Sequence, residues 1–238
     1  MVKKRAIKVF LGVCVALAVS AGCRCAPDTG TGSVVHSSGE RLVLPGSPYA
    51  AEPKDVKLLN EYGDFALFSG ETEADGVFNA EAKQNGNWNR RNSLFLRKRA
   101  KEGTNAWWLV LTSGGDWKDA DGMNKWCKMW ADSIRDCFNV IRASLSKDGR
   151  YVWMVYNPYI PLYDVVCRFD LRENTLCVLI DGFDAIEQPD GTILVKGKKT
   201  YLSDENGEPL GARWYDLWMT PEGKIVRKGR LKTAEEVD

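Results

Sequence analysis

Carboxylates are the side chains best placed for catalysis, because the chain holds a single histidine. His36 lies in a stretch rich in Gly, Ser and Pro. A Ser-His-Asp or Cys-His site needs an imidazole that the fold holds in position, and a zinc site based on histidine needs further ligands. The sequence therefore predicts no catalytic residue of these classes, no metal ligands and no cofactor.

Acidic residues are densest between residues 116 and 132. Paired Asp or Glu side chains can supply the acid and the base of glycoside hydrolysis without histidine. Four aspartates lie in this stretch, but their spacing specifies no catalytic geometry. A solvated acidic loop is a simpler explanation of the cluster. A carboxylate-dependent glycan hydrolase is the alternative function, and its candidate carboxylates are Asp116, Asp119, Asp121 and Asp132.

The nine tryptophans suggest a binding surface. Flat aromatic rings stack on sugars or anchor protein partners when they are exposed. Trp107 and Trp108 are neighbours in a predicted strand, so their rings point to opposite faces, and both are buried only if the sheet is covered on both sides. We expect an exposed aromatic platform formed by Trp107, Trp108 and Trp117, with core packing as the alternative.

Cys167 and Cys177 flank the turn "DLREN" and lie on predicted neighbouring strands. They are a candidate disulfide in an oxidising compartment. The alternative is that each is a small buried apolar side chain, as cysteines in strands often are. Neither pair of cysteines in the predicted domain has the close C-x-x-C spacing of a zinc knuckle.

The N-terminus predicts export. The basic residues of "MVKKR" precede the apolar run "VFLGVCVALAV", which has the length of a signal peptide and is short for a membrane span. The run ends in "SAG" before Cys23, an order that resembles the lipobox of bacterial lipoproteins. Membership of that class implies cleavage before Cys23 and acylation of its thiol. Ser20 departs from the pattern, which usually has Leu, Val or Ile there.

The alternative is ordinary signal cleavage after Ala21, which gives a soluble periplasmic or secreted protein. Removal of residues 1–22 takes away four basic residues and no acidic one, leaving 29 basic and 32 acidic residues. A slightly acidic chain disfavours a nucleic-acid partner, since phosphate neutralisation dominates such binding. We predict a signal peptide at 1–22, a flexible lipid-anchored tether at 23–54 and one mainly β domain at 55–238.

Short β-branched and aromatic runs alternate with turn signals through the second half, which predicts antiparallel hairpins or a meander. "YVWMVY" is apolar on both faces and predicts an inner strand, whereas "KGKK" at 196–199 predicts an exposed turn. Met123, Trp126, Trp130 and Ile134 recur at helical spacing, which predicts one short amphipathic helix near 122–136.

Residues 138–182 resemble the repeats of TolB-type β-propellers, in which a Ser-Pro-Asp-Gly-Lys/Arg turn precedes an apolar strand. Ser146, Asp148, Gly149 and Arg150 match that turn, and Lys147 replaces the proline. The resemblance implies a partial or small propeller-like arrangement. An open meander and a β-sandwich remain alternatives.

These features favour an exported protein of the bacterial cell envelope that binds a ligand rather than transforms it. Its predicted partners are the membrane, through the N-terminal lipid, and a glycan or an envelope protein.

Overall fold

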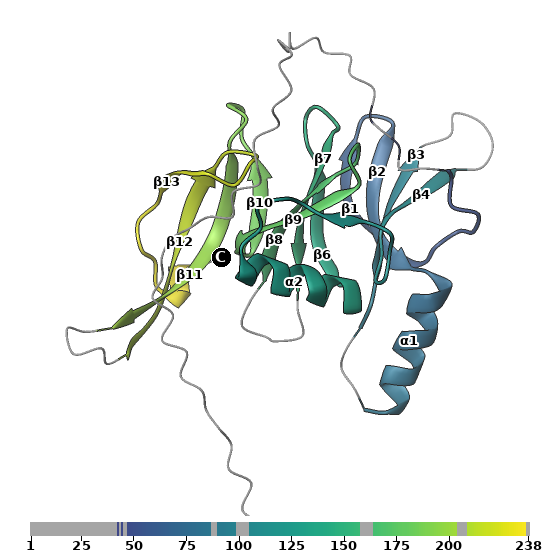
Figure 1. Ribbon diagram of the computed structural model, residues 1–238, viewed down its shortest axis with the longest axis horizontal. Helices are drawn as coiled ribbons and strands as arrows, with labels where there is room; N and C mark the ends of the chain where they lie inside the picture. Colours follow the sequence, from purple (N-terminus) through teal and green to yellow (C-terminus); the bar gives the residue numbers. More distant parts are fainter. Residues whose placement is uncertain are drawn as a thin grey trace, which may run out of the picture.

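The computed structural model describes residues 42, 44, 47–86, 90–98, 105–157, 164–203 and 209–236. Within these ranges the chain forms three β-sheets and two α-helices (Figure 1). The prediction of a mainly β, antiparallel fold with a short amphipathic helix is confirmed. The described strands do not show a closed barrel or a propeller.

Sheet A is an antiparallel meander from the first part of the chain. Its strands, in both spatial and sequence order, are β1 (Lys54–Tyr62), β2 (Phe65–Glu71), β3 (Ser93–Lys98) and β4 (Ala106–Leu111). Helix α1 (Glu73–Gln84) connects β2 to β3, and a capping box between Thr72 and Asp75 begins it. Because β1 is the first strand, one of its edges has no neighbour within the sheet.

Sheet B has the spatial order β5-β9-β8-β7-β6, and its last four strands also form a meander. The short β5 pairs in parallel with β9, and the other neighbours are antiparallel. The strands are β5 (Lys118–Asp119), β6 (Val140–Leu145), β7 (Tyr151–Tyr156), β8 (Val165–Asp170) and β9 (Thr175–Asp181). As predicted, "YVWMVY" forms the inner strand β7, and five of its six residues are buried.

Sheet C is the third antiparallel meander, and β10 forms one edge of it. Its strands are β10 (Asp184–Glu187), β11 (Ile193–Ser203), β12 (Pro209–Met219) and β13 (Ile225–Lys228), followed by a 3-10 turn at Ala234–Glu236. The prediction of a turn at 196–199 is wrong, because β11 runs through these residues. The strand has a bulge between Val195 and Lys198, where Gly197 adopts a φ of 67°. A glycine in this conformation is common in turns as well as in bulges, so the local sequence resembles a turn.

The turn between β6 and β7 is built by the residues that carry the propeller-repeat resemblance. The Oγ of Ser146 donates to Asp148 Oδ1 at 2.6 Å and accepts from the N–H of Tyr151 at 2.8 Å. Asp148 Oδ1 also accepts from the N–H of Arg150, and Gly149 adopts a φ of 69° that favours glycine. Short side chains thus satisfy the backbone of the turn.

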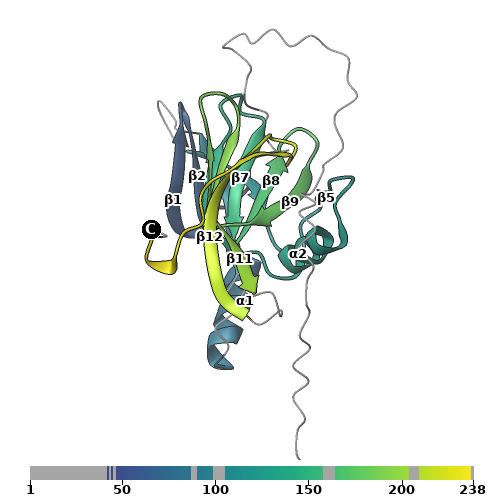
Figure 2. The ribbon, with the colours of Figure 1, turned by 90° about the vertical axis from the view of Figure 1, so that its left-hand side faces the viewer.

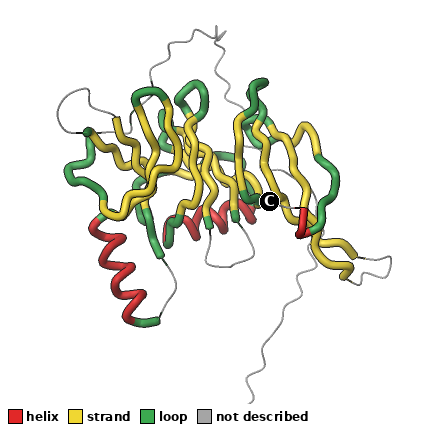
Figure 3. The backbone as a smooth tube through the Cα atoms, turned by 180° about the vertical axis from the view of Figure 1, so that it is seen from behind, coloured by secondary structure: helices red, strands yellow, loops and turns green. Residues whose placement is uncertain are grey.

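Helix α2 (Lys125–Asp136) is the predicted amphipathic helix, and it packs against β9 (Figure 2). Asn124 caps it by accepting from the N–H of Cys127. Trp130 and Ile134 are buried, whereas Trp126 is 37% exposed. Both α-helices lie toward the same end of the molecule (Figure 3).

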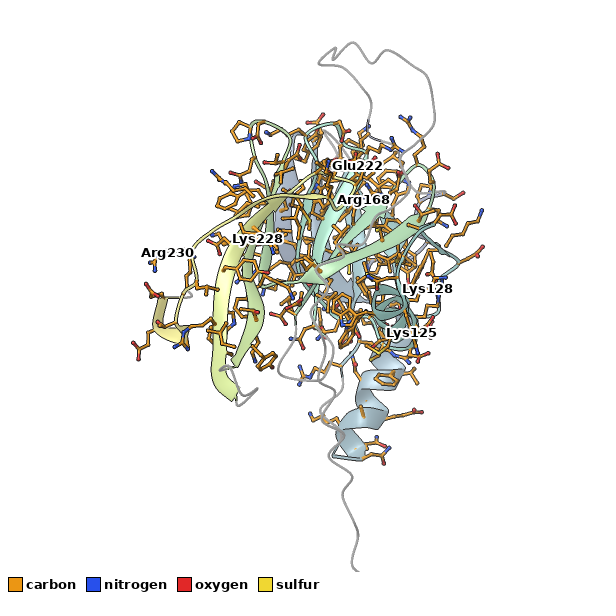
Figure 4. The ribbon with its side chains drawn as sticks, turned by 60° about the vertical axis from the view of Figure 1, so that its left-hand side comes forward. Lys125, Lys128, Arg168, Glu222, Lys228 and Arg230 are labelled. Atoms are coloured by element: carbon orange, nitrogen blue, oxygen red, sulfur yellow. The ribbon has the colours of Figure 1, made fainter. Side chains whose placement is uncertain are left out.

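Sheet B lies between sheets A and C, and one apolar core continues through all three (Figure 1). On the side of sheet C, Arg168 Nη1 donates to the carbonyl of Pro221 at 2.8 Å, in the turn between β12 and β13. Figure 4 shows Arg168 beside Glu222 of that turn. This packing brings the free edges of β1, β6 and β10 toward one another.

Candidate ligand-binding groove

A groove of about 590 Å³ lies where the first strands of the three meanders meet. It is lined by Lys147 and by residues 57–60 of β1, 141–145 of β6, 153–155 of β7 and 184–187 of β10. Its size falls within the range of ordinary small-ligand sites. Segments separated by more than a hundred residues therefore form one concave surface.

Apolar side chains on two walls of the groove are open to solvent. Leu58 on β1 is 49% exposed, and Ile186 on β10 is 37% exposed. Ala143 and Met154 lie beneath them and are buried. Exposed aliphatic walls above a buried floor offer a ligand apolar contact area.

Polar contacts hold β10 against sheet B along the groove. Arg142 Nη1 lies 3.1 Å from the carbonyl oxygen of Phe183, to which it donates, and 3.4 Å from Asp184 Oδ2. Farther along, the backbone N–H of Lys147 donates to Glu187 Oε2 at 2.8 Å, and Lys147 Nζ donates to the carbonyl of Gln188 at 2.7 Å. These contacts fix the distance between two walls.

The C-terminal end of β1 is also hydrogen-bonded to the turn between β6 and β7. The hydroxyl of Tyr62 donates to the carbonyl of Lys147, so all three sheets are linked near the turn between β6 and β7. Burial raises the pKa of Tyr62 above its usual value, and the negative charges of Asp148 and Glu187 raise it further. Tyr62 therefore remains a neutral hydrogen-bond donor across the physiological pH range.

A second carboxylate lies near Arg142. Asp164 Oδ1 accepts from the side-chain amide of Asn157 at 2.5 Å. Burial raises the pKa of Asp164, although the hydrogen bond from Asn157 and the charge of Arg142 both lower it. Arg142 thus lies within the field of two carboxylates, Asp164 and Asp184, at this end of the groove.

Two polar groups of the groove are only partly satisfied by the described residues. The backbone N–H of Leu145 on β6 donates to Asn60 Oδ1 at 3.4 Å, a long hydrogen bond. The indole Nε1 of Trp153, a residue that is 1% exposed, has no hydrogen-bond acceptor there. The N–H of Leu145 is therefore suited to a closer acceptor, whereas Trp153 Nε1 is itself buried.

The predicted aromatic platform is wrong, because all three of its tryptophans are buried. Trp107, Trp108 and Trp117 are 5%, 6% and 4% exposed. Sheet A is covered on both faces: Trp108 packs into the main core, and Trp107 packs with Phe68 and Phe95 in a smaller cluster. The guanidinium carbon of Arg135 lies 3.8 Å from the ring centroid of Trp117. Core packing, the alternative, explains these rings.

The four aspartates proposed as candidate hydrolase carboxylates lie outside the groove. Asp119 Oδ1 forms an ion pair with Arg135 Nη2 at 2.8 Å. The other three, Asp116, Asp121 and Asp132, are exposed. Within the described ranges, no group of three or more His, Cys, Asp or Glu side chains could hold a metal ion.

The predicted disulfide between Cys167 and Cys177 is also wrong. Cys167 lies opposite Val178 and Cys177 lies opposite Arg168, so the two sulfur atoms point to opposite faces of sheet B. The Sγ of Cys167 donates to the carbonyl of Val165 at 3.8 Å. The turn between Asp170 and Thr175 has four residues, and this even number sets a register in which Cys167 and Cys177 face opposite ways.

Cys23 and His36 lie outside the described residues. Neither α-helix in the described ranges has the length and apolar character needed to cross a membrane. The groove residues had no local signal in the sequence, since they come from four strands in three sheets. The one useful indication was the turn motif after β6, which located the strand but not its neighbours.

Comparisons with protein-family models, with curated proteins and with solved structures found no match to this chain.

Proposed function

We propose that this chain is an exported protein of the bacterial cell envelope that acts as a binding or scaffold module. Acyl chains on Cys23 hold it to a membrane, and the groove between β1, β6 and β10 binds its ligand. The anchor assignment is supported by the basic N-terminus, the apolar run and the small residues before Cys23. Ordinary signal cleavage, which releases a soluble protein, is the competing outcome.

The observation that carries the binding role is the combination of exposed apolar walls and a weakly bonded backbone donor in one groove. Leu58 and Ile186 supply the apolar contacts, and the N–H of Leu145, whose hydrogen bond to Asn60 is long, supplies the donor. The groove carboxylates are already engaged: Asp184 pairs with Arg142, and Glu187 accepts from Lys147. Engaged carboxylates favour ligand binding over acid–base hydrolysis, which needs groups that gain and lose protons.

Binding of a probe panel to matched variants tests the groove. The probes are envelope glycans and synthetic peptides, titrated by calorimetry. Leu58→Asp and Ile186→Asp place a charge in each apolar wall, and Val226→Asp places one on β13, outside the groove, at a residue that is 52% exposed. We expect at least about tenfold weaker binding for the groove variants and unchanged binding for Val226→Asp.

The groove assignment is wrong if no probe binds the native chain, or if the groove variants bind as well as the native chain does. Product formation from a glycan, abolished by Asp184→Asn or Glu187→Gln, would instead favour the hydrolase. The anchor has its own test in metabolic labelling with palmitate. The label should enter the native chain and disappear in Cys23→Ser, and label that persists in the variant contradicts the assignment.

A further inference from the structure

We infer that the groove accepts an extended polypeptide segment, which adds to the open edge of β6 as one more strand of sheet B. This inference rests on the proposed function, because it names the ligand class of the same groove. Strand addition supplies affinity through main-chain hydrogen bonds and specificity through pockets for alternate side chains. The groove offers both.

The backbone of β6 provides the main-chain groups. Ser146 N donates inward to the carbonyl of Tyr151, whereas Leu145 N points outward to Asn60. Directions alternate along a strand, and the register of β6 with β7 is regular from Arg142 to Leu145. The N–H and C=O of Ala143 therefore also point outward, into an edge that pairs with no described strand.

Asn60 indicates where an added strand would begin. Its Oδ1 accepts from Leu145 N in the position that the carbonyl oxygen of a neighbouring strand would occupy. The contact is long, at 3.4 Å, so a ligand carbonyl at normal hydrogen-bond distance could replace it. At the other end of β6, Asn92 pairs with both main-chain groups of Val140. Two asparagines thus substitute for a pairing strand at the ends of this edge, and Ala143 between them is left open to a ligand.

The two walls of the groove receive alternate side chains of such a strand. Figure 1 shows β6 between β10 and β1. Arg142 extends toward Asp184 on β10, so the face of sheet B that carries Arg142 and Ser144 is the one turned to β10. Strands β1 and β2 of sheet A also contact β6, and Ala143 and Leu145 point to the face opposite to Arg142. Successive ligand side chains would point to β10 and to β1 in turn.

The charges of these walls differ in sign. Lys57 is exposed on the β1 wall, and Asp184 and Glu187 lie on the β10 wall. In a matching segment the side chains alternate between two kinds. Acidic or apolar side chains would face the β1 wall, and basic or apolar side chains would face the β10 wall. Asp184 pairs with Arg142 and Glu187 accepts from the backbone N–H of Lys147, so the wall charges are largely satisfied within the protein. The main-chain groups of Ala143 that point outward are therefore what favours polypeptide as the ligand class.

The length of the edge limits the segment. The groove includes residues 141–145 of β6, which span about 16 Å at the usual rise of a strand. A hexapeptide is long enough to cover this edge. The probe is a set of N-acetylated, fluorescein-labelled hexapeptides. Positions 1, 3 and 5 are Glu or Leu, and positions 2, 4 and 6 are Lys or Ile. In a reference set, Glu replaces every Lys.

Fluorescence anisotropy on the full chain is followed by an N-methyl scan of the tightest peptide. N-methylation removes one main-chain donor at a time. We expect at least about tenfold weaker binding at alternate positions, whose N–H groups face β6, and little change at the intervening ones. Binding should also slow hydrogen exchange of the Ala143 amide, and the reference set should bind more weakly.

Leu58→Asp and Ile186→Asp should weaken peptide binding, whereas Val226→Asp should not. An N-methyl scan without the two-residue period, or equal binding of both peptide sets, overturns strand addition. Groove-dependent binding of glycans without peptide binding overturns the inference and leaves the proposed function in place. Absence of any groove-dependent binding overturns both.

Discussion

Arg150 closes over Asp170 where β7 begins and β8 ends. Its Nε and Nη2 lie 3.0 and 2.9 Å from Asp170 Oδ2, and the side chain of Asp170 is 5% exposed. The second carboxylate oxygen accepts from the backbone N–H groups of Arg172 and Glu173. One buried carboxylate therefore ties an arginine to the turn that leads into β9.

Replacing Asp170 with alanine should destabilise the fold strongly. Asp170→Ala leaves Arg150 and two backbone donors without their acceptor, so the free energy of unfolding should fall by about 3 kcal/mol. Urea denaturation measures the change. Asp121→Ala, at an exposed aspartate, serves as the control and should change the value by less than about 0.5 kcal/mol. Equal values for both variants would contradict the assigned role.

The start of α1 depends on a buried aspartate. Asp75 is 2% exposed, and its Oδ2 accepts from Thr72 N, Thr72 Oγ1 and Ser93 Oγ at 3.0, 2.8 and 2.5 Å. Asp75→Ala should lower the free energy of unfolding by about 2 kcal/mol, because it removes both the cap and the link to β3. Glu73→Ala in the same turn is exposed and should cost below about 1 kcal/mol. Chemical denaturation followed by circular dichroism compares them.

Trp107 should matter for stability and not for ligand contact. Trp107→Ala removes a ring that is 5% exposed, and should cost about 3 to 5 kcal/mol of unfolding free energy. Trp126→Ala, at 37% exposure, should cost much less. Differential scanning calorimetry measures both. Trp107→Phe preserves much of the packing, and it should bind the peptide or glycan probes with native affinity; loss of binding in this folded variant would contradict a purely structural role.

Tyr156 should make the fold sensitive to alkali. Its side chain is fully buried, and burial raises its pKa from 10.0 to about 12, against the lowering effect of its hydrogen bond with Ser133. The folded state thus keeps a proton that the unfolded state loses. Its stabilising contribution is complete below pH 10 and disappears as the pH rises through about 12.

Tyr156→Phe should therefore flatten the dependence of unfolding free energy on pH. Urea denaturation at about pH 9 and about pH 11.5 gives the difference. Burial also raises the pKa values of Tyr62, Tyr151 and Tyr215, so part of the dependence should remain. Tyr201→Phe, at a residue that is 59% exposed, should keep the native slope. A native slope in Tyr156→Phe would show that the phenol contributes nothing.

The bulge in β11 requires a glycine. A Cβ on Gly197 would lie 2.3 Å from Phe183 Cδ2, and the φ of 67° is itself unfavourable for other residues. Gly197→Ala should cost more than about 2 kcal/mol. Gly211→Ala shares the positive φ but meets no atom within 4 Å, so it should cost about 1 kcal/mol. Thermal denaturation of both variants separates steric contact from backbone strain.

Local patterns predicted the elements that depend on local chemistry. The predicted period of α2 holds at Trp130 and Ile134, which are buried, whereas Met123 is buried but precedes the helix and Trp126 is 37% exposed. Ser146 and Asp148 indicated a turn because their side chains bond to the backbone nearby. Helix α1 was not predicted, since its apolar period is weak, although Thr72 and Asp75 have the spacing of a capping box.

Long-range relationships were beyond the reach of the sequence pattern. Whether Trp107 is buried depends on what covers the second face of sheet A. Whether Cys167 and Cys177 face the same side depends on the number of residues in the turn between β8 and β9, because a change of one residue there reverses the facing of one strand relative to the other. The groove requires β1, β6 and β10 to meet, and that meeting depends on the packing of three sheets.

The strands of each meander are consecutive in the chain. Only the two-residue β5, which pairs with β9, is distant in sequence from its neighbour in the sheet. Pairing within one sheet thus needs no residue from a later sheet, and most connections are short, apart from the one through α1 between β2 and β3. Such connectivity favours rapid, stepwise folding, and an N-terminal unit can pair while the ribosome is still making the next. The groove is then completed only after sheets A and B, because its third wall arrives with β10.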